Sequence, residues 1–563
     1  AMGHFNFCCS VSFYNLPTFY KVWGRGIFME RQKGILERHW YLYATEFFAG
    51  MALMAVEIGA QRLISPYFSS SQIIWTLIIG TIMIAMALGN VYGGRTADKD
   101  PNPDRLYRRI FIAALWLALI PFLGKYIIIG ISGLLLLTID TWFLVWAALV
   151  TCLVLFVFPL FLLGTVTPSL ARYCVEKKEE TGGIVGRLGA ANTIGSILGT
   201  FLPTFVTIPA AGTNLTFLLF AGILLLLSLV YWGATRHNRK KILVGIALYL
   251  LACLLGHRTS FAFWENPKKI LYEGESTYNY LQVREEPDSV ILSTNVLFGV
   301  QSIKMKQEGL TGMYYDVALA APGMADIQHK EHPSLLILGM GTGTYAHQCQ
   351  RHFPKLTITG VEIDPQITAL ARQYFALPDT IPVTAYDGRA YLAADSRQYD
   401  LIMVDAYQDI TIPFAMSTRE FFSSVQQHLS PGGVMVLNMN MKGETPGNIN
   451  HYLADTVASV FPTVYTADVP HATNRELFAG DSPAMVNFLW QALSQEKNPE
   501  LRTQLEQVVR QLKPYHKGNR ILTDDRAPVE LLGMQTIDGR IHSEVGQYRE
   551  ILKKQGIQGI LGE

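Results

Sequence analysis

The stretch Leu335-Leu336-Ile337-Leu338-Gly339-Met340-Gly341-Thr342-Gly343-Thr344 decides the fold of the second half of this chain. Its four leading apolar residues predict a buried strand, and the glycines predict a tight turn that leads into a helix. Glycine is favoured in such a turn because it adopts φ values that other residues resist and lets a ligand approach the backbone closely. Strand, glycine loop and helix in this order are typical of proteins that bind nucleotides or nucleosides.

Three further apolar runs of strand length follow the loop, at 356–361, 382–386 and 399–404, and each ends on an acidic residue. Glu362 stands about twenty residues past the loop, where a carboxylate accepts both ribose hydroxyls. Asp387, followed by Gly388, is placed to accept from an adenine amino group. Asp405 is predicted at the carboxyl edge of the sheet, where ligands of open α/β folds bind. The pattern therefore predicts a parallel sheet that binds S-adenosylmethionine or a close relative.

Composition divides the chain into two unlike halves. It has 563 residues, of which 50% are hydrophobic and only 16% charged. Soluble proteins usually carry about 25% charged residues, and the deficit lies in the first half. The net charge of +1 gives no electrostatic footprint for nucleic acid. We therefore expect the bilayer and a small molecule as partners; a homodimer stays open, because the sequence does not determine the oligomeric state.

Seven apolar segments in the first half are candidates for membrane spans. They lie near 41–63, 73–92, 109–131, 142–170, 188–209, 213–233 and 242–256, and the last is short for a full crossing. We predict a loop at 65–71 between the first two. Glu57 and Arg62 in the first span indicate either a polar site inside the bundle or, for Arg62, a side chain that reaches back to the interface.

Topology leaves alternatives open. Basic clusters before the first span, after the second and after the sixth all favour the inner side of the membrane. Seven full crossings would then place the second half outside, whereas a donor of the adenosylmethionine type is a cytosolic metabolite. Either 242–256 does not cross, or 109–172 crosses three times, or the domain is external. We expect an integral protein of the bacterial inner membrane with its second half in the cytoplasm.

These patterns predict a multi-pass α-helical membrane domain followed by an α/β Rossmann-like domain of the class I methyltransferase type, with a small antiparallel β-sheet before it. The predicted units are an N-terminal segment 1–40, compatible with an interfacial helix, a transmembrane domain 41–256, a small β domain 264–330, the Rossmann domain 331–540 and a tail 541–563. Strands are expected at 278–283, 289–293 and 296–303, then at 433–438 after a Pro-Gly-Gly turn.

Several motifs together resemble the spermidine synthases, or polyamine aminopropyltransferases, and in particular their membrane-fused branch. The resemblance covers roughly residues 268–535. It rests on the hairpin motifs 274–280 and 297–302, Tyr314-Tyr315-Asp316, Val361-Glu362-Ile363-Asp364, Asp387-Gly388, Asp405 and the segment 522–530, Leu-Thr-Asp-Asp-Arg-Ala-Pro-Val-Glu.

The resemblance implies transfer of an aminopropyl group from decarboxylated S-adenosylmethionine to a di- or polyamine such as putrescine, with release of methylthioadenosine and without a metal. An alkylamine with a pKa near 10.4 is protonated at neutral pH, so a base must deprotonate it, and Asp405 falls on the family's catalytic aspartate. The resemblance implies a donor site of Asn279, Gly339, Gly341, Gly343, Glu362, Ile363, Asp387, Gly388 and Pro413. It implies an acceptor side of Tyr278, Gln301, Tyr315, Asp316, Thr342, Asp405, Tyr407 and Asp409.

The chain departs from the family pattern at positions that the resemblance links to substrate specificity. Thr342 stands where the family usually has an aspartate that repels the carboxylate of intact S-adenosylmethionine. Asp405 and Asp409 are four residues apart rather than three, Asn279 replaces glutamine, and Tyr315 replaces histidine. Two alternatives stay open: a transferase that moves a methyl or aminocarboxypropyl group from intact S-adenosylmethionine, and a non-catalytic sensor or transporter of polyamines or nucleosides.

Overall fold

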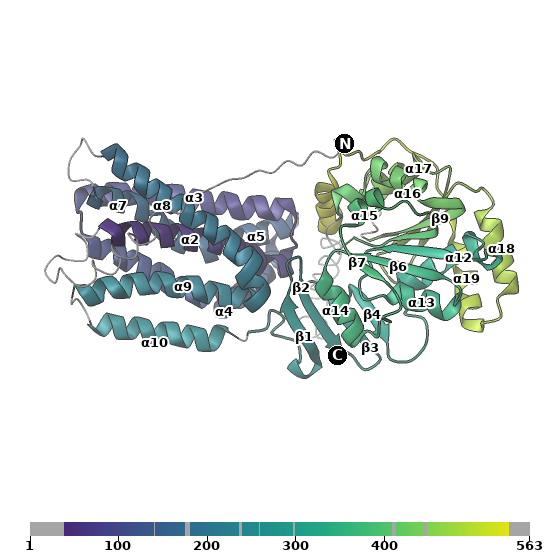
Figure 1. The fold of residues 1–563 in the computed structure, drawn as a ribbon, viewed down its shortest axis with the longest axis horizontal. Helices are drawn as coiled ribbons and strands as arrows, with labels where there is room; N and C mark the ends of the chain where they lie inside the picture. Colours follow the sequence, from purple (N-terminus) through teal and green to yellow (C-terminus); the bar gives the residue numbers. More distant parts are fainter. Residues whose placement is uncertain are drawn as a thin grey trace, which may run out of the picture.

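The structure, a computed structural model, has a bundle of long helices and an α/β part, with a small sheet between them (Figure 1). It describes residues 39–139, 141–174, 181–235, 239–257, 259–296, 299–407, 412–440, 442 and 447–539. The predicted segment 1–40, apart from its last two residues, and the predicted tail 541–563 lie outside these ranges. The boundaries of the predicted domains stay predictions.

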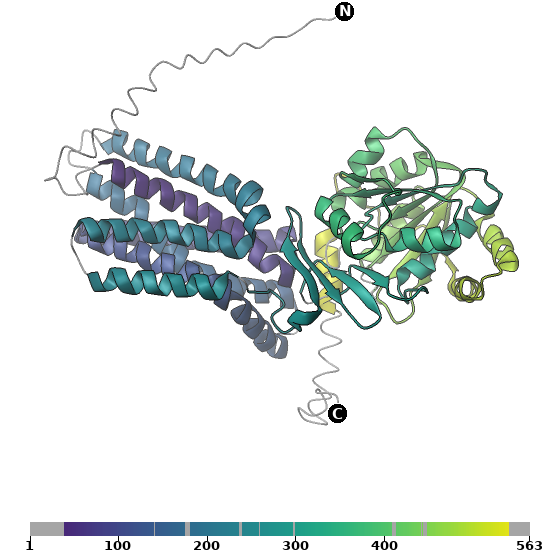
Figure 2. The same cartoon turned by 60° about the horizontal axis from the view of Figure 1, so that its bottom comes forward.

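Long apolar helices build the bundle. They are α2 (His39–Phe68), α3 (Gln72–Lys99), α4 (Pro103–Thr138), α5 (Phe143–Cys152), α6 (Phe158–Gly164), α7 (Val166–Cys174), α8 (Thr181–Leu202), α9 (Ile208–Ala234) and α10 (Arg239–Gly256), with π-helical turns η2 (Leu153–Val157) and η4 (Pro203–Thr207). Figure 2 shows the helices side by side, with their long axes nearly parallel. Each apolar helix buries one side against its neighbours, while large apolar side chains such as Met83, Ile84 and Leu254 stay exposed.

The predicted loop at 65–71 is wrong in its first half, because α2 continues through Phe68. Tyr67 and Phe68 are fully buried, and the Tyr67 hydroxyl donates to the Phe261 carbonyl at 2.9 Å. This packing keeps the last turn helical despite Pro66. The connection is short, and α3 is capped by Ser71, whose Oγ accepts from the Ile74 N–H at 3.3 Å.

Within the described ranges, five helical segments are long and apolar enough to cross a bilayer. They are Trp40–Phe68, Gln72–Lys99, Pro103–Leu136, Phe143–Cys174 and Thr181–Ala234. The number differs from the predicted seven for two reasons. The fifth segment contains α8, η4 and α9 in one run, with a kink inside α9 at Gly212, which has φ 82° and ψ 168°. Helix α10 begins with the three charges of Arg239-Lys240-Lys241.

The small sheet links the bundle to the second half. It is antiparallel in the order β1-β2-β3-β4, with β1 Ile270–Glu275, β2 Tyr280–Glu285, β3 Ser289–Ser293 and β4 Ser302–Met305. The last strand is shorter than predicted. Val296 is not in the ladder, since its N–H donates to the carbonyl of Pro66 in the bundle at 3.0 Å.

The large sheet has the order β12-β10-β11-β9-β8-β5-β6-β7. Its parallel strands are β5 (Ser334–Leu338), β6 (Thr357–Glu362), β7 (Val383–Ala385), β8 (Tyr399–Val404) and β9 (Leu429–Met439), and its antiparallel edge is β10 (Thr463–Asp468), β11 (Arg475–Gly480) and β12 (Lys513–Pro514). The helices that surround this sheet (Figure 1) are α11 (Tyr314–Ala318), α12 (Ala320–Met324), α13 (Thr344–His352), α14 (Pro365–Tyr374), α15 (Gly388–Ala394), α16 (Arg419–Gln427), α17 (Ile449–Ala458), α18 (Met485–Gln495) and α19 (Pro499–Gln511).

The order of the parallel strands brings the predicted strand ends together. Strand β5 lies between β8 and β6, and β6 lies beside β7. Because parallel strands end at the same edge, the residues that follow β5, β6, β7 and β8 meet there. The large sheet is therefore a Rossmann-like α/β sheet with its candidate site at the carboxyl edge.

Candidate active site

A cavity of about 300 Å³ lies at this edge. The predicted residues that line it are Tyr278, Asn279, Gln301, Gly339, Gly341, Glu362, Ile363, Asp387, Gly388, Asp405 and Pro413. They come from the loops of the small sheet and from the ends of the parallel strands with the loops that follow them, and they span residues 278–413 of the sequence. Ser70, from the connection between α2 and α3, also lines this cavity.

The glycine loop packs directly onto the end of β8. Gly339 has φ 87°, and a Cβ on it would lie 2.4 Å from the backbone oxygen of Asp405. No side chain fits there, so the loop needs glycine for both its conformation and its close packing. Two residues on, the Gly341 N–H donates to Oε2 of Glu362 at 2.8 Å. The loop thereby holds the acid at the end of the neighbouring strand.

Glu362 is buried and held by two backbone donors. Its Oε2 accepts from Gly341, and its Oε1 accepts from the N–H of Asp364 at 3.1 Å. Burial raises the pKa of Glu362 to about 7, although these backbone hydrogen bonds oppose the rise. A fixed carboxylate that lines a cavity can accept hydrogen bonds from two vicinal hydroxyls, as a ribose presents them.

Asp387 begins helix α15 and caps it. Its Oδ1 accepts from the Ala390 N–H at 2.8 Å, which fixes the side chain at the rim of the cavity. A carboxylate has two oxygens with about four acceptor positions, so a capping bond leaves capacity for a ligand. This geometry is suited to accepting from an amino group of a base.

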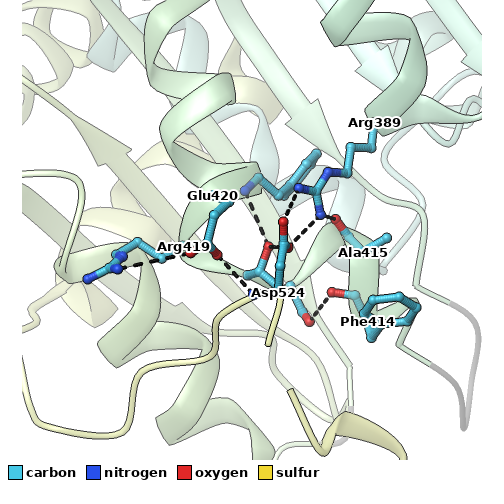
Figure 3. A network of polar contacts seen from close by, with 9 residues as sticks. Arg389, Phe414, Ala415, Arg419, Glu420 and Asp524 are labelled. Carbon is cyan, nitrogen blue, oxygen red and sulfur yellow. Dashed lines mark hydrogen bonds and ion pairs between the residues drawn. The ribbon is translucent and has the colours of Figure 1, made fainter. Parts of the chain in front are cut away.

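Figure 3 shows the polar contacts that hold the segment 522–530 near this acid. Arg389 donates to both carboxylate oxygens of Asp524, at 2.7 and 2.5 Å, and to the Ala415 carbonyl at 3.0 Å. A bidentate pair of this kind fixes orientation as well as distance. Because Arg389 follows Asp387 by two residues, the pair ties the start of α15 to the segment 522–530, and the bond to Ala415 ties it to the loop whose Pro413 and Met416 line the cavity.

Asp405 is held by two neutral donors. Asn438 Nδ2 donates to its Oδ1 at 2.8 Å, and the Tyr314 hydroxyl donates to its Oδ2 at 2.8 Å. Burial raises the pKa of Asp405 to about 7; these two hydrogen bonds oppose the rise and the charge of Glu362 adds to it. A base whose pKa lies near the operating pH is well matched to proton transfer. The arrangement can therefore accept a proton from a ligand amine.

Other predicted residues do not line this cavity. The Tyr315 hydroxyl donates to the Gln301 carbonyl at 3.2 Å, and the Tyr407 hydroxyl donates to the Met416 carbonyl at 2.9 Å. Asp316 accepts from the N–H groups of Thr311 and Gly312, and so stabilises its own turn. Their predicted roles toward an amine stay predictions.

Thr342 does not line the cavity just described, although its N–H donates at 3.3 Å to Oγ of Ser302, which does. It is 1% exposed, its hydroxyl lies 3.4 Å from that of Thr344, and it borders a separate cavity of about 410 Å³. Gly343, with φ 84°, is the N-cap of helix α13 and lines neither of these two cavities. Asp409 lies outside the described residues, and its predicted role beside Asp405 stays a prediction.

The sequence patterns did not indicate the two hydrogen-bond donors of Asp405. Tyr314 belongs to the motif Tyr314-Tyr315-Asp316, and Asn438 ends the strand predicted at 433–438. The rule that residues after parallel strands gather at one edge would have found Asn438. Neither position carries a charge, which is why no acidic pattern pointed to them.

Glu476 was also missed, and it is an unusual group. It is fully buried on β11, opposite Asn438 on β9. Neither of its carboxyl oxygens has a hydrogen-bond partner among the described residues. Burial, with a smaller contribution from the charge of Asp405, raises the pKa of Glu476 well above its usual range. Folding therefore favours the neutral form of this carboxyl.

We expect Glu476→Gln to make the full chain more stable than the wild type at pH 8, and nearly equal to it in stability at pH 4. Because the pKa of Glu476 is higher in the folded than in the unfolded protein, folding takes up a proton. The wild-type free energy of unfolding therefore falls as the pH rises above about 4.3, the pKa of glutamate in the unfolded chain, by about 1.4 kcal/mol per pH unit. Glutamine has the same shape and does not titrate. Melting temperatures in detergent at both pH values test this; an equal difference at both would contradict the assigned protonation.

The fold and the site together define a class of protein: a Rossmann-like α/β protein whose glycine loop and acidic strand ends surround one cavity. Residues 315–479 match the Spermine/spermidine synthase domain. A probable polyamine aminopropyl transferase of Bifidobacterium longum is 51% identical over 350 residues, which are 59% of this chain and 77% of that protein. The chain therefore belongs to the polyamine aminopropyltransferase family, and it is a transferase.

Other relatives are more distant. A polyamine aminopropyltransferase of Vibrio vulnificus is 25% identical over 51% of this chain and 98% of its own length. A human eEF1A lysine and N-terminal methyltransferase is 33% identical over 26% of this chain and 22% of its own. Among solved structures, spermidine synthase from Thermotoga maritima is 18% identical over 43% of this chain and 84% of its own, with a TM-score of 0.36.

Proposed function

We propose that the protein transfers an aminopropyl group from decarboxylated S-adenosylmethionine to a di- or polyamine such as putrescine, and releases methylthioadenosine. The observation that carries this proposal is the placement of Asp405, held by Asn438 and Tyr314, on the wall of the cavity that also contains Glu362 and Asp387. Family membership supports the transfer itself, and the named donor and acceptor are part of the proposal.

In this proposal the two ends of the cavity have different tasks. Glu362 accepts from the ribose hydroxyls and Asp387 from the adenine amino group, so the sulfur of the donor lies toward Asp405. The acceptor ammonium gives one proton to Asp405, and its nitrogen lone pair then attacks the methylene carbon next to the sulfonium. A C–N bond forms as the C–S bond breaks, and the C–S electron pair stays on the sulfur of methylthioadenosine.

We further propose that the protein is anchored in the bacterial inner membrane, with its catalytic part in the cytoplasm. The five apolar helical segments support anchoring. The proposed donor is a cytosolic metabolite, which supports the cytoplasmic side. Cysteine labelling tests this orientation. Exposed Lys513 or exposed His332 is replaced by cysteine, and its reaction with a reagent that does not cross the membrane is compared between intact and opened cells.

Product analysis by mass spectrometry tests the reaction. The full chain in detergent is given decarboxylated or intact S-adenosylmethionine with a panel of amines, and Asp405→Asn is the matched control. We expect an acceptor that is heavier by one aminopropyl group, together with methylthioadenosine, from the decarboxylated donor. Methylated or aminocarboxypropylated products from the intact donor would instead establish the second candidate function.

That second candidate, a transferase using intact S-adenosylmethionine, has one specific observation in its favour. Thr342 stands where the family resemblance implies an acid that repels the carboxylate of the intact donor; Thr342 itself does not line the cavity, but Gly341 directly before it does. The likeness of one part of the chain to a methyltransferase is in line with it. The longer match to an aminopropyl transferase favours the first candidate.

A further inference from the structure

Arg62 is a charged residue on an apolar helix, and the structure shows what it contacts. It lies near the end of α2, and its Nη1 donates to the Ser276 carbonyl at 3.2 Å while its Nη2 donates to the Thr277 carbonyl. Both carbonyls belong to the turn between β1 and β2. Two donors of one planar guanidinium therefore hold one turn of the small sheet.

The same turn holds an acid beneath the nucleoside cavity. Ser276 Oγ donates to Oδ2 of Asp364 at 2.5 Å, and Asn279 Nδ2 donates to the same oxygen at 3.0 Å. Asp364 is fully buried, and its own N–H donates to Oε1 of Glu362 at 3.1 Å. Arg62 of a bundle helix is thus connected to the proposed ribose carboxylate by three hydrogen bonds, through Ser276 and Asp364.

Other hydrogen bonds also attach the bundle to the small sheet and to the second half of the chain. The Gln72 N–H, at the start of α3, donates to Oε2 of Glu530 at 2.6 Å. Thr213 donates to both oxygens of Glu275 at 2.6 Å, through its N–H and its hydroxyl. Ser70, two residues before Gln72, lines the cavity itself. The end of the bundle is therefore a wall of the site and not only a support for it.

The geometry points to Arg62 as a positioning residue of the donor site. By holding the turn 276–279 it orients Asp364, and through Asp364 it orients Glu362. The membrane bundle thereby contributes to nucleoside affinity through a side chain that does not touch the nucleoside. This inference rests on the proposed function, because it assigns the cavity to a thioadenosine nucleoside.

Calorimetry with methylthioadenosine on the full chain in detergent tests the inference. We expect Arg62→Met to weaken binding by about 3- to 30-fold, and Arg62→Lys to weaken it less, since an ammonium still reaches a carbonyl. Turnover at saturating donor should stay near wild type because Asp405 is outside the path. Arg105→Met is the matched control: its Nη2 pairs with Asp100 at 2.6 Å beyond the far end of α3, about 40 Å away along the helix.

A double-mutant cycle separates positioning from simple support. If the path transmits the effect, Arg62→Met and Ser276→Ala together should weaken binding by less than the product of their separate effects. Wild-type affinity in Arg62→Met, or independent effects in the cycle, would overturn the inference while leaving the proposed function intact. Failure of the wild type to bind methylthioadenosine would instead reject the proposed function.

Discussion

Asp405→Asn should lower turnover by about two to four decades. Asparagine keeps the size of the side chain and can still accept from one of the two donors, Asn438 or Tyr314, but it cannot take a proton from an ammonium. Nucleoside affinity should change little, since Glu362 and Asp387 make those contacts in our proposal. Steady-state turnover with the products identified above is the measurement, and calorimetry with methylthioadenosine shows whether the site is intact.

The pH profile gives this prediction a second readout. Asp405 acts as a base only when ionised, and its pKa is about 7. At pH values below 7 the wild-type rate should therefore fall by about tenfold per unit. Tyr314→Phe removes one hydrogen bond that stabilises the carboxylate, and should move this limb to higher pH. Turnover of Asp405→Asn equal to wild type would remove Asp405 from the mechanism.

Glu362→Ala should weaken methylthioadenosine binding by about 1.5 to 3 kcal/mol, or roughly 10- to 150-fold. The loss arises because a ribose hydroxyl in the cavity would have no charged acceptor. Calorimetry at pH 8, where the wild-type carboxylate is ionised, measures it most directly. Unchanged affinity would show that the nucleoside does not use this acid.

The same acid should make binding depend on pH. Burial places the pKa of Glu362 at about 7 in the unliganded protein, and binding needs the ionised form. Affinity should therefore rise between pH 6 and pH 8, and Glu362→Gln should lose that rise. Asp405→Asn is the matched control, because it removes the other carboxyl of the cavity with a pKa near 7 and should keep the dependence.

The sequence by itself determined the elements whose signals are local. The apolar run 335–338, the glycine loop and the acids after the next strands predicted the Rossmann-like sheet, since neighbouring residues determine backbone conformation and where strands end. Glu362, Asp387 and Asp405 line one cavity, as the order of the strands required. The long apolar segments indicated a helical bundle for a similar reason, because bilayer thickness sets a minimum length.

Only the tertiary structure decided which side chains complete the site. Asn438 and Tyr314 reach Asp405 from segments far apart in the sequence, and nothing local marks an uncharged residue as the partner of an acid. The sequence showed Arg62 as a charge in an apolar helix and left its partner open. Its contacts with the carbonyls of Ser276 and Thr277 are made by backbone atoms, which every residue carries, so no sequence pattern records them.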